Sequence, residues 1–232
     1  MTGLLETTID ALILLVSLDA ELWKIVAISF SVSLQAVLYT APVGFLVGFL
    51  LAYTSFHGRK VAISIVNTLW AVPAVVVGLT LYLLLSRAGP MGDWQWLFTQ
   101  KAMILGQMLL SLPVIIVMAH TAFQAGDRRA WETALTLGAT PMRAVFTVMF
   151  EVRYGLAAAM IAAFGRVIAE VGCSMMVGGN ILHHTRNIPT AIALETSKGA
   201  FTQGIALGIV LVLLALTLNF GVEFFRGRGS VQ

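Results

Sequence analysis

Long apolar segments dominate the chain, and their lengths predict membrane-spanning helices. Each contains the ~20 apolar residues that a helix needs to cross a bilayer, and most are longer, which permits tilting. We expect five such helices, at residues 22–53, 61–86, 101–124, 152–177 and 200–225. Pro73 and Pro113 predict kinks in the second and third. A further apolar stretch, residues 9–18, is too short to span and is expected at the membrane interface or against the bundle.

The fold class that follows is an all-α, polytopic membrane protein with one transmembrane domain over residues 1–232. Composition supports it, because 59% of the residues are hydrophobic and only 11% are charged, whereas soluble domains average about 25% charged residues. Three segments lie outside the spans: an N-terminal interfacial segment at 1–20, a polar helical region at 127–149 and a long connection at 178–199. The last is expected to contain a short helix from Pro189 to about Ser197.

Lysine and arginine are divided unequally between the two sides of the predicted bundle. One side carries eight, at Arg59, Lys60, Arg128, Arg129, Arg143, Arg153, Arg226 and Arg228. The other carries five, at Lys24, Arg87, Lys101, Arg186 and Lys198. Because cytoplasmic loops are enriched in Lys and Arg, this predicts an external N-terminus, a cytoplasmic C-terminus and a cytoplasmic 127–149 region. The net charge of +3 and the lack of a charge block argue against a nucleic-acid partner.

The polar region at 127–149 has the signals of two short helices. Asp127 is suited to an N-cap and Gly138 to the position after a helix. Thr140 and Pro141 are suited to restart a helix, with proline at its first position. Between the caps, an apolar stripe follows helical spacing at Trp131, Ala134, Leu135 and Gly138. Such a stripe, which no spanning helix has to cover, is expected to fit a groove on another protein.

The stretch ETALTLGAT within this region resembles the EAA motif of ABC importer permeases. Glu132 takes the place of the motif's glutamate, Thr133 and Ala134 of its alanines, and Gly138 of its glycine. Two departures are Thr133, where the motif has alanine, and Phe150-Glu151, where the family often has Leu-Pro. The resemblance implies a coupling helix that docks on an ATPase. The docking residues would be Ala130, Trp131, Glu132, Thr133, Ala134, Leu135, Gly138 and Pro141.

The resemblance extends to the permeases of the molybdate, tungstate and sulphate group. Residues 19–60 look like their first helix, and GRVIAEVGCSMMVGGNI (165–181) resembles their segment of Arg, four residues to Glu, then Gly. Residues 177–199 are most similar to the tungstate branch. The resemblance implies a type I ABC importer fold and the inner membrane of a prokaryote. It implies a homodimer with two cytoplasmic ATPase subunits, which bind ATP and Mg²⁺, and an external substrate-binding protein. This chain itself would hold no cofactor and would not be an enzyme.

The end of the fourth predicted span is the candidate translocation pathway. Arg166 and Glu170 lie four residues apart, on one face of the predicted helix. Such a pair either forms part of a gate or fixes helix packing, and we favour packing because charges at membrane depth are usually paired. Small, polar and sulfur-containing residues follow and suit a gate, although close helix packing is the alternative. These pathway residues are Gly172, Cys173, Ser174, Met175, Met176, Gly178, Gly179 and Asn180.

Several other features are interpreted as structural. His183 and His184 lack a carboxylate at ligand spacing and are expected to be exposed loop residues, so no metal site is predicted. The glycine pairs Gly44/Gly48 and Gly204/Gly208 predict close helix packing, within or between subunits. Cys173, the single cysteine, lacks nearby partners for a redox or metal site.

Three functions from other classes are less well supported. A secondary transporter coupled to an ion would need intramembrane carboxylates and usually an inverted repeat, and only Glu170 qualifies. An intramembrane enzyme would need a motif such as HExxH or GxSxG, and neither occurs. A non-transporting scaffold would leave the resemblance to the EAA motif unexplained. If the chain is an importer permease, tungstate is favoured as the substrate, followed by molybdate and then sulphate.

Overall fold

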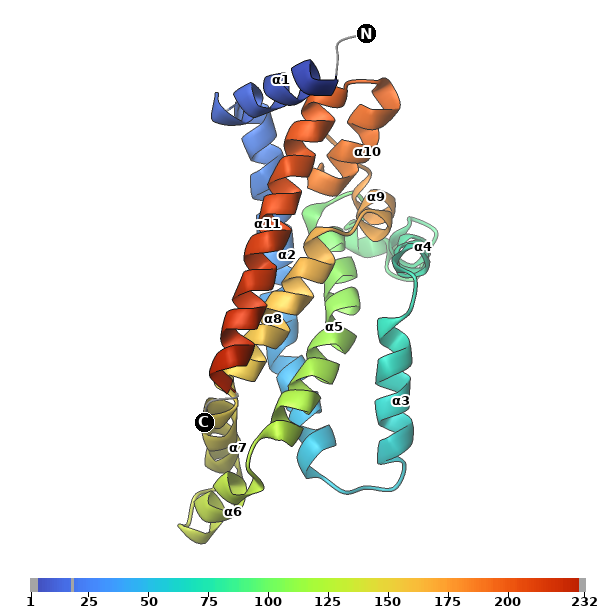
Figure 1. Ribbon diagram of the computed structural model, residues 1–232. Coiled ribbons are helices and arrows are strands. Elements are labelled where there is room, and N and C mark those ends of the chain that lie inside the picture. Colours follow the sequence, from blue (N-terminus) through green and yellow to red (C-terminus); the bar gives the residue numbers. More distant parts are fainter. Residues whose placement is uncertain (1–3, 18, 230–232) are drawn as a thin grey trace. The chain divides into compact units, whose positions relative to one another are not determined.

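The computed structural model describes residues 4–17 and 19–229, and the regular elements among them are helices. The prediction of an all-α fold is therefore confirmed. The elements, in chain order, are α1 (Leu4–Val16), α2 (Ala20–Tyr53), α3 (Arg59–Trp70), α4 (Ala74–Leu85), the short 3₁₀ helix η1 (Gly92–Trp94), α5 (Gln100–Ala125), α6 (Arg128–Thr136), α7 (Pro141–Glu151), α8 (Arg153–Ile168), α9 (Gly172–Gly178), α10 (Ile188–Lys198) and α11 (Phe201–Gly229) (Figure 1).

The chain forms two compact units, each built from three stretches of sequence. Unit 1 takes its described residues from the ranges Met1–Ala36, Pro73–Leu110 and Gly165–Thr217. Unit 2 takes them from Val37–Val72, Ser111–Phe164 and Leu218–Gln232. The helices α2, α5, α8 and α11 each contribute residues to both units.

Unit 1 has a core in which α1, α2, α10 and α11 meet (Figure 1). Ala11 of α1, Leu22 of α2 and Ile188 of α10 are each fully buried in it. The start of α10 is fixed by its caps, since the Asn187 side chain accepts a hydrogen bond from the N–H of Thr190. The short helix predicted from Pro189 to about Ser197 is confirmed as α10.

The apolar stretch predicted at residues 9–18 is helical in α1, and residue 18 lies outside the described residues. One side of α1 packs on the core of unit 1 through Ala11, with Leu14 and Leu15 against it. The other side exposes apolar residues, namely Ile9, Leu12, Ile13 and Val16. The expectation that this stretch packs on the bundle is confirmed.

Unit 2 depends on a close approach between the later parts of α2 and α5. A Cβ atom added at Gly44 would lie 2.5 Å from Cγ2 of Ile115, and one at Gly48 would lie 2.9 Å from Cβ of Ala119. The two glycines of α2 therefore lie directly against residues of α5, which confirms close packing at this glycine pair. The second pair differs, because nothing lies within 4 Å of a Cβ added at Gly208.

Three helices are each long and apolar enough to cross a membrane: Ala20–Tyr53, Gln100–Ala125 and the Phe201–Phe225 part of α11. Two bent helix pairs, α3 with α4 and α7 with α8, meet the same test as pairs. Within the described residues, the number of spans is therefore three, or up to five if each bent pair is one span. This upper value matches the predicted five.

Two predicted spans were wrong in outline. Residues 61–86 do not form one kinked helix, because α3 ends at Trp70 and α4 begins at Ala74. Pro73, which lacks an N–H group and disfavours helical backbone in the residue before it, sits at the N-cap of α4. The fourth segment was predicted at 152–177, but α8 ends at Ile168 and the following residues form the separate helix α9. By contrast, α5 continues through Pro113.

The contact between α2 and α5 predicts a clear difference between two glycine substitutions. Gly48→Val should destabilise the protein by about 1–3 kcal/mol, the usual effect of overpacking a closed contact, because the new side chain meets Ala119 and the backbone N of His120. Gly208→Val is the matched control in a helix and should change stability far less. Thermal unfolding of the purified protein in detergent measures both, and equal losses would contradict the contact.

Candidate coupling surface and pathway segment

The polar region at 127–149 folds as the two short helices that the sequence predicts. The Asp127 carboxylate accepts a hydrogen bond from the N–H of Arg129 and so caps α6. Gly138 follows the helix with a φ of +82°, which glycine adopts without strain. Thr140 is the N-cap of α7 and Pro141 its first residue. The predicted caps at Asp127 and Gly138 are confirmed, although the Thr140 side chain makes no capping bond.

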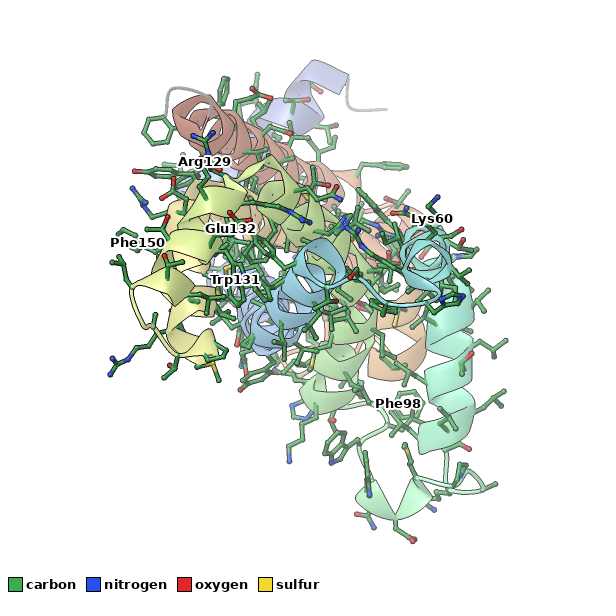
Figure 2. The ribbon with its side chains drawn as sticks, turned by 90° about the horizontal axis from the view of Figure 1, so that it is seen from below. Lys60, Phe98, Arg129, Trp131, Glu132 and Phe150 are labelled. Carbon is green, nitrogen blue, oxygen red and sulfur yellow. The ribbon has the colours of Figure 1, made fainter. Side chains whose placement is uncertain are left out.

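The apolar stripe of α6 is divided, because Trp131 and Ala134 are half-buried whereas Leu135 and Gly138 are exposed. Trp131 is half-buried in an aromatic cluster of unit 2, with its ring 5.4 Å from that of Phe49 and 5.7 Å from that of Tyr53, both in α2. The Phe49 ring in turn meets the Phe123 ring of α5 at 5.5 Å. Trp131 thus makes contacts within its own chain, and the prediction that it also fits a groove on another protein stays a prediction. The Trp131 side chain is directed at α2 of the same chain (Figure 2).

The exposed side of α6 and its following turn is mixed in character. Leu137 is 82% exposed and Leu135 is 39% exposed. Polar residues surround them, and Glu132 lies on the exposed side (Figure 2). Of the predicted docking residues, this leaves Glu132, Thr133, Leu135, Gly138 and Pro141 exposed, whereas Ala130, Trp131 and Ala134 are half-buried.

The end of α2 lies beside this surface and is held by two arginines from outside the helix. Nε of Arg59 donates to the carbonyl of Leu51 at 2.6 Å. Nη2 of Arg128, in α6, donates to the carbonyl of Ala52 at 3.1 Å. The Arg128 guanidinium also lies over the Tyr53 ring, at 5.7 Å from its centroid. Positive charge at a helix C-terminus is favourable, so both arginines stabilise this end.

The candidate pathway segment begins at a break in the chain. Arg166 lies in the last turn of α8, while Glu170 lies between α8 and α9 rather than on a continuous helix. Oε2 of Glu170 pairs with Nη1 of Arg166 at 2.9 Å. Oε1 of Glu170 accepts from the N–H groups of Gly172 at 2.9 Å and Cys173 at 3.4 Å. The carboxylate thus binds the start of α9 as well as the arginine in the last turn of α8.

The helix α9 is packed closely against α4 and α5 within unit 1. A Cβ atom added at Gly78 of α4 would lie 2.8 Å from Cα of Cys173, and one at Gly106 of α5 would lie 2.5 Å from its Sγ. Gly178 meets Met103 in the same way, at 2.8 Å from its Sδ. The glycines allow these helices to contact α9 directly.

The pathway residues therefore differ in exposure. Cys173, Ser174 and Gly178 are buried, Gly172 and Met176 are half-buried, and Met175 is exposed. Gly179 and Asn180 end α9 with positive φ angles of +69° and +51°. The prediction that this segment lines a pathway stays a prediction, and it applies most directly to Met175, the residue of α9 that unit 1 leaves exposed.

The sequence reasoning missed several buried polar side chains. Gln107 in α5 is 1% exposed, and its Oε1 has no hydrogen-bond partner among the described residues. The hydroxyl oxygens of Ser33 in α2 and Ser174 in α9 are also buried and have no hydrogen-bond partner among the described residues. A glutamine in the apolar middle of a long helix was the signal available for Gln107. The role of Arg128 was missed because its partner lies 76 residues away.

The two adjacent histidines are exposed, as predicted. His183 has a φ of +61°, within the loop before α10. Within the part of the chain that the structure describes, there is no group of three or more His, Cys, Asp or Glu side chains placed to hold a metal ion.

A family model described as "Binding-protein-dependent transport system inner membrane component" matches residues 44–228. The chain belongs to this family. It is a permease subunit of an ABC importer, and the match covers α6, Gly138 and the pathway segment. The departure at Phe150-Glu151 does not remove the chain from the family.

Relatives named for anions support this assignment to the permeases. A "probable anion ABC transporter permease protein" of Haloferax volcanii is 40% identical over 88% of this chain and 90% of its own length. A tungstate uptake system permease protein, TupB, of Campylobacter jejuni is 42% identical over 72% of this chain and 70% of its own. A molybdenum transport system permease protein, ModB, of Escherichia coli is 29% identical over 84% and 89%. The permease is thus similar to the molybdate, tungstate and sulphate group that the motifs indicated.

Solved structures give the same fold. The MetNI methionine ABC transporter, in an inward-facing conformation, contains a chain that matches with a TM-score of 0.63 at 19% identity. The match covers 90% of the permease and 94% of that chain. At this identity the likeness shows the fold alone, which is that of ABC importer transmembrane subunits.

The dual use of Glu170 predicts that its two roles can be separated. Glu170→Gln loses the ion pair but keeps an oxygen that can accept from Gly172 and Cys173. Glu170→Ala also leaves those N–H groups without their acceptor, which costs about 1–3 kcal/mol for each buried group. We therefore expect thermal unfolding in detergent to show a larger loss for Glu170→Ala. Equal losses in the two variants would show that the contact with α9 contributes nothing.

Proposed function

We propose that this chain is the transmembrane subunit of an ATP-driven importer for tungstate. The observation that carries the proposal is the surface of α6 and the turn after it, where Glu132 and Gly138 match the EAA motif and Leu137 is almost fully exposed. The similarity to TupB of Campylobacter jejuni supports tungstate as the oxyanion, since this relative is more similar than the ModB relative. Molybdate, followed by sulphate, is the alternative within the same group.

The partners follow from that surface. A cytoplasmic ATPase would bind the exposed side of α6, which includes Glu132, Leu135 and Leu137. Two permease copies and two ATPase copies would form the complex, because the spans of one chain are too few for a central pore. An external binding protein would deliver the oxyanion to the 178–199 connection, which contains α10. ATP and Mg²⁺ would bind to the ATPase, and none of these groups is assigned to the permease.

In the proposed orientation of the permease, the ATPase surface faces the cytoplasm of a prokaryotic cell. The basic residues of the 127–149 region, together with Arg59 and Lys60, are the support for this side. The N-terminus would then be external and the C-terminus cytoplasmic, with the permease in the inner membrane. Tight oxyanion binding within the permease would slow release, so a weakly polar pathway suits transient passage.

An ion-coupled secondary transporter is the alternative from a different class. Its coupling site would need a carboxylate that is free to exchange its partner. Glu170, the candidate from the sequence, already has both oxygens in contact with Arg166 and the start of α9. This arrangement favours a structural role for the pair, in agreement with the packing alternative that the sequence favoured.

Reconstitution in proteoliposomes with the ATPase and the binding protein tests the proposal. We expect ATP-dependent uptake of tungstate, with less uptake of molybdate and least of sulphate at equal concentrations. Leu137→Asp places a charge on the exposed apolar side chain of the proposed ATPase surface. It should abolish both co-purification of the ATPase and uptake.

Arg87→Ala is the control, because Arg87 is an exposed residue of unit 1 far along the chain from α6. It should keep the ATPase and the uptake. Uptake that needs no ATP and is sensitive to a protonophore would contradict the importer in favour of the secondary transporter. Preference for sulphate would contradict the assignment of tungstate.

A further inference from the structure

We propose that Arg128 and Trp131 are positioning residues that link α6 to the ends of α2 and α5, so that these two helices follow the movement of the coupling helix. The inference rests on the proposed function and names the route by which the ATPase would act on the membrane part of unit 2. Each step of this route is a contact within unit 2.

The first contact joins α6 to the end of α2. The last carbonyl groups of a helix have no donor within the helix, and α2 has no basic residue in its last turn. Arg128 donates to the carbonyl of Ala52 at 3.1 Å, shorter than the 3.4 Å bond that Arg59 donates to the same carbonyl, and it lies over the ring of Tyr53. Hydrogen bonds from charged donors are about twice as strong as neutral ones. One side chain of α6 therefore holds two consecutive residues of α2.

The second contact joins α6 to α2 and α5 together. Trp131 lies one helical turn after Arg128, so both project from the same side of α6. Its ring packs on the rings of Phe49 and Tyr53. Phe49 also meets the ring of Phe123 in α5 edge to face, at 84°. A displacement of Trp131 would consequently press on both membrane helices.

The third contact makes α2 and α5 a single body in this unit. Gly44 and Gly48 bring the backbone of α2 against Ile115 and Ala119 of α5. Such close-packed contacts transmit displacement because they contain little free volume. The push on Phe49 would therefore move both helices rather than deform the space between them.

One side of α6 would thus bind the ATPase, while the other side contacts α2. Glu132 and Leu137 are exposed and available to the ATPase, whereas Trp131 is directed at α2 (Figure 2). Arg129 provides a natural comparison with Arg128. It has the same charge, lies next to Arg128 and is likewise exposed, but its side chain lies at the edge of α6, away from Trp131 (Figure 2).

The test measures how much tungstate enters per ATP hydrolysed in proteoliposomes that hold the permease, the ATPase and the binding protein. For Arg128→Ala we expect normal co-purification of the ATPase and continued ATP hydrolysis. Tungstate import per ATP should fall at least about tenfold, the factor expected from the loss of a charge-assisted hydrogen bond. Trp131→Ala should behave in the same way, while Trp131→Phe, which keeps a ring in the cluster, should recover most of the import. Arg129→Ala is the matched control and should equal the wild type.

Each outcome decides between distinct conclusions. Import per ATP in Arg128→Ala equal to that in Arg129→Ala would overturn the link. Loss of the ATPase from Arg128→Ala would also overturn it, since Arg128 would then belong to the docking surface. If Trp131→Ala fails to fold, Arg128→Ala still decides, because truncating an exposed side chain leaves no cavity in the core. A wild-type complex without ATP-dependent tungstate uptake would instead refute the proposed function.

Discussion

The packing of the half-buried Trp131 is the interaction on which α6 and the end of α2 depend. A short polar helix such as α6 has little stability of its own, since isolated helices of this length are marginal in water. Trp131 supplies the missing stability by packing on Phe49 and Tyr53, and the hydrogen bond from Arg128 to Ala52 adds to it. The same two contacts satisfy the end of α2. One set of interactions therefore both stabilises α6 and attaches it to α2.

A charged side chain also binds the end of a helix in unit 1, at the break between α8 and α9. There, one carboxylate oxygen of Glu170 binds Arg166 of α8, and the other accepts from the first N–H groups of α9. Glycines at positions 78 and 106 then allow α4 and α5 to approach Cys173 closely. In both units, a charged side chain completes the end of a helix and glycines set the distance between helices. The permease thus combines short helices with tightly packed contacts.

Local signals in the sequence predicted a large part of this structure. The caps at Asp127 and Gly138, the restart at Pro141 and the close packing at Gly44 and Gly48 each depend on one or two residues, and each was confirmed. The direction of Trp131 was not predictable, because a stripe at helical spacing does not say whether its partner is the same chain or another one. The break at Glu170 was missed because a spacing of four residues from Arg166 suits a continuous helix equally well. The split at Pro73 was predicted only as a kink, since the sequence does not show how far the two halves separate.

A distance between α2 and α6, measured with and without ATP, shows whether these two helices move together. Spin labels at Leu46 of α2 and Thr136 of α6, both exposed, can be introduced after Cys173→Ser removes the single cysteine. Dimers of the proposed complex with one labelled copy, bound to the ATPase in nanodiscs, would give the distance by double electron–electron resonance. If α2 follows α6, this distance is the same with and without bound ATP, while a pair of labels at Thr136 in the two copies changes its separation. A shift in the distance from Leu46 to Thr136 on ATP binding would instead show that α6 moves independently of α2.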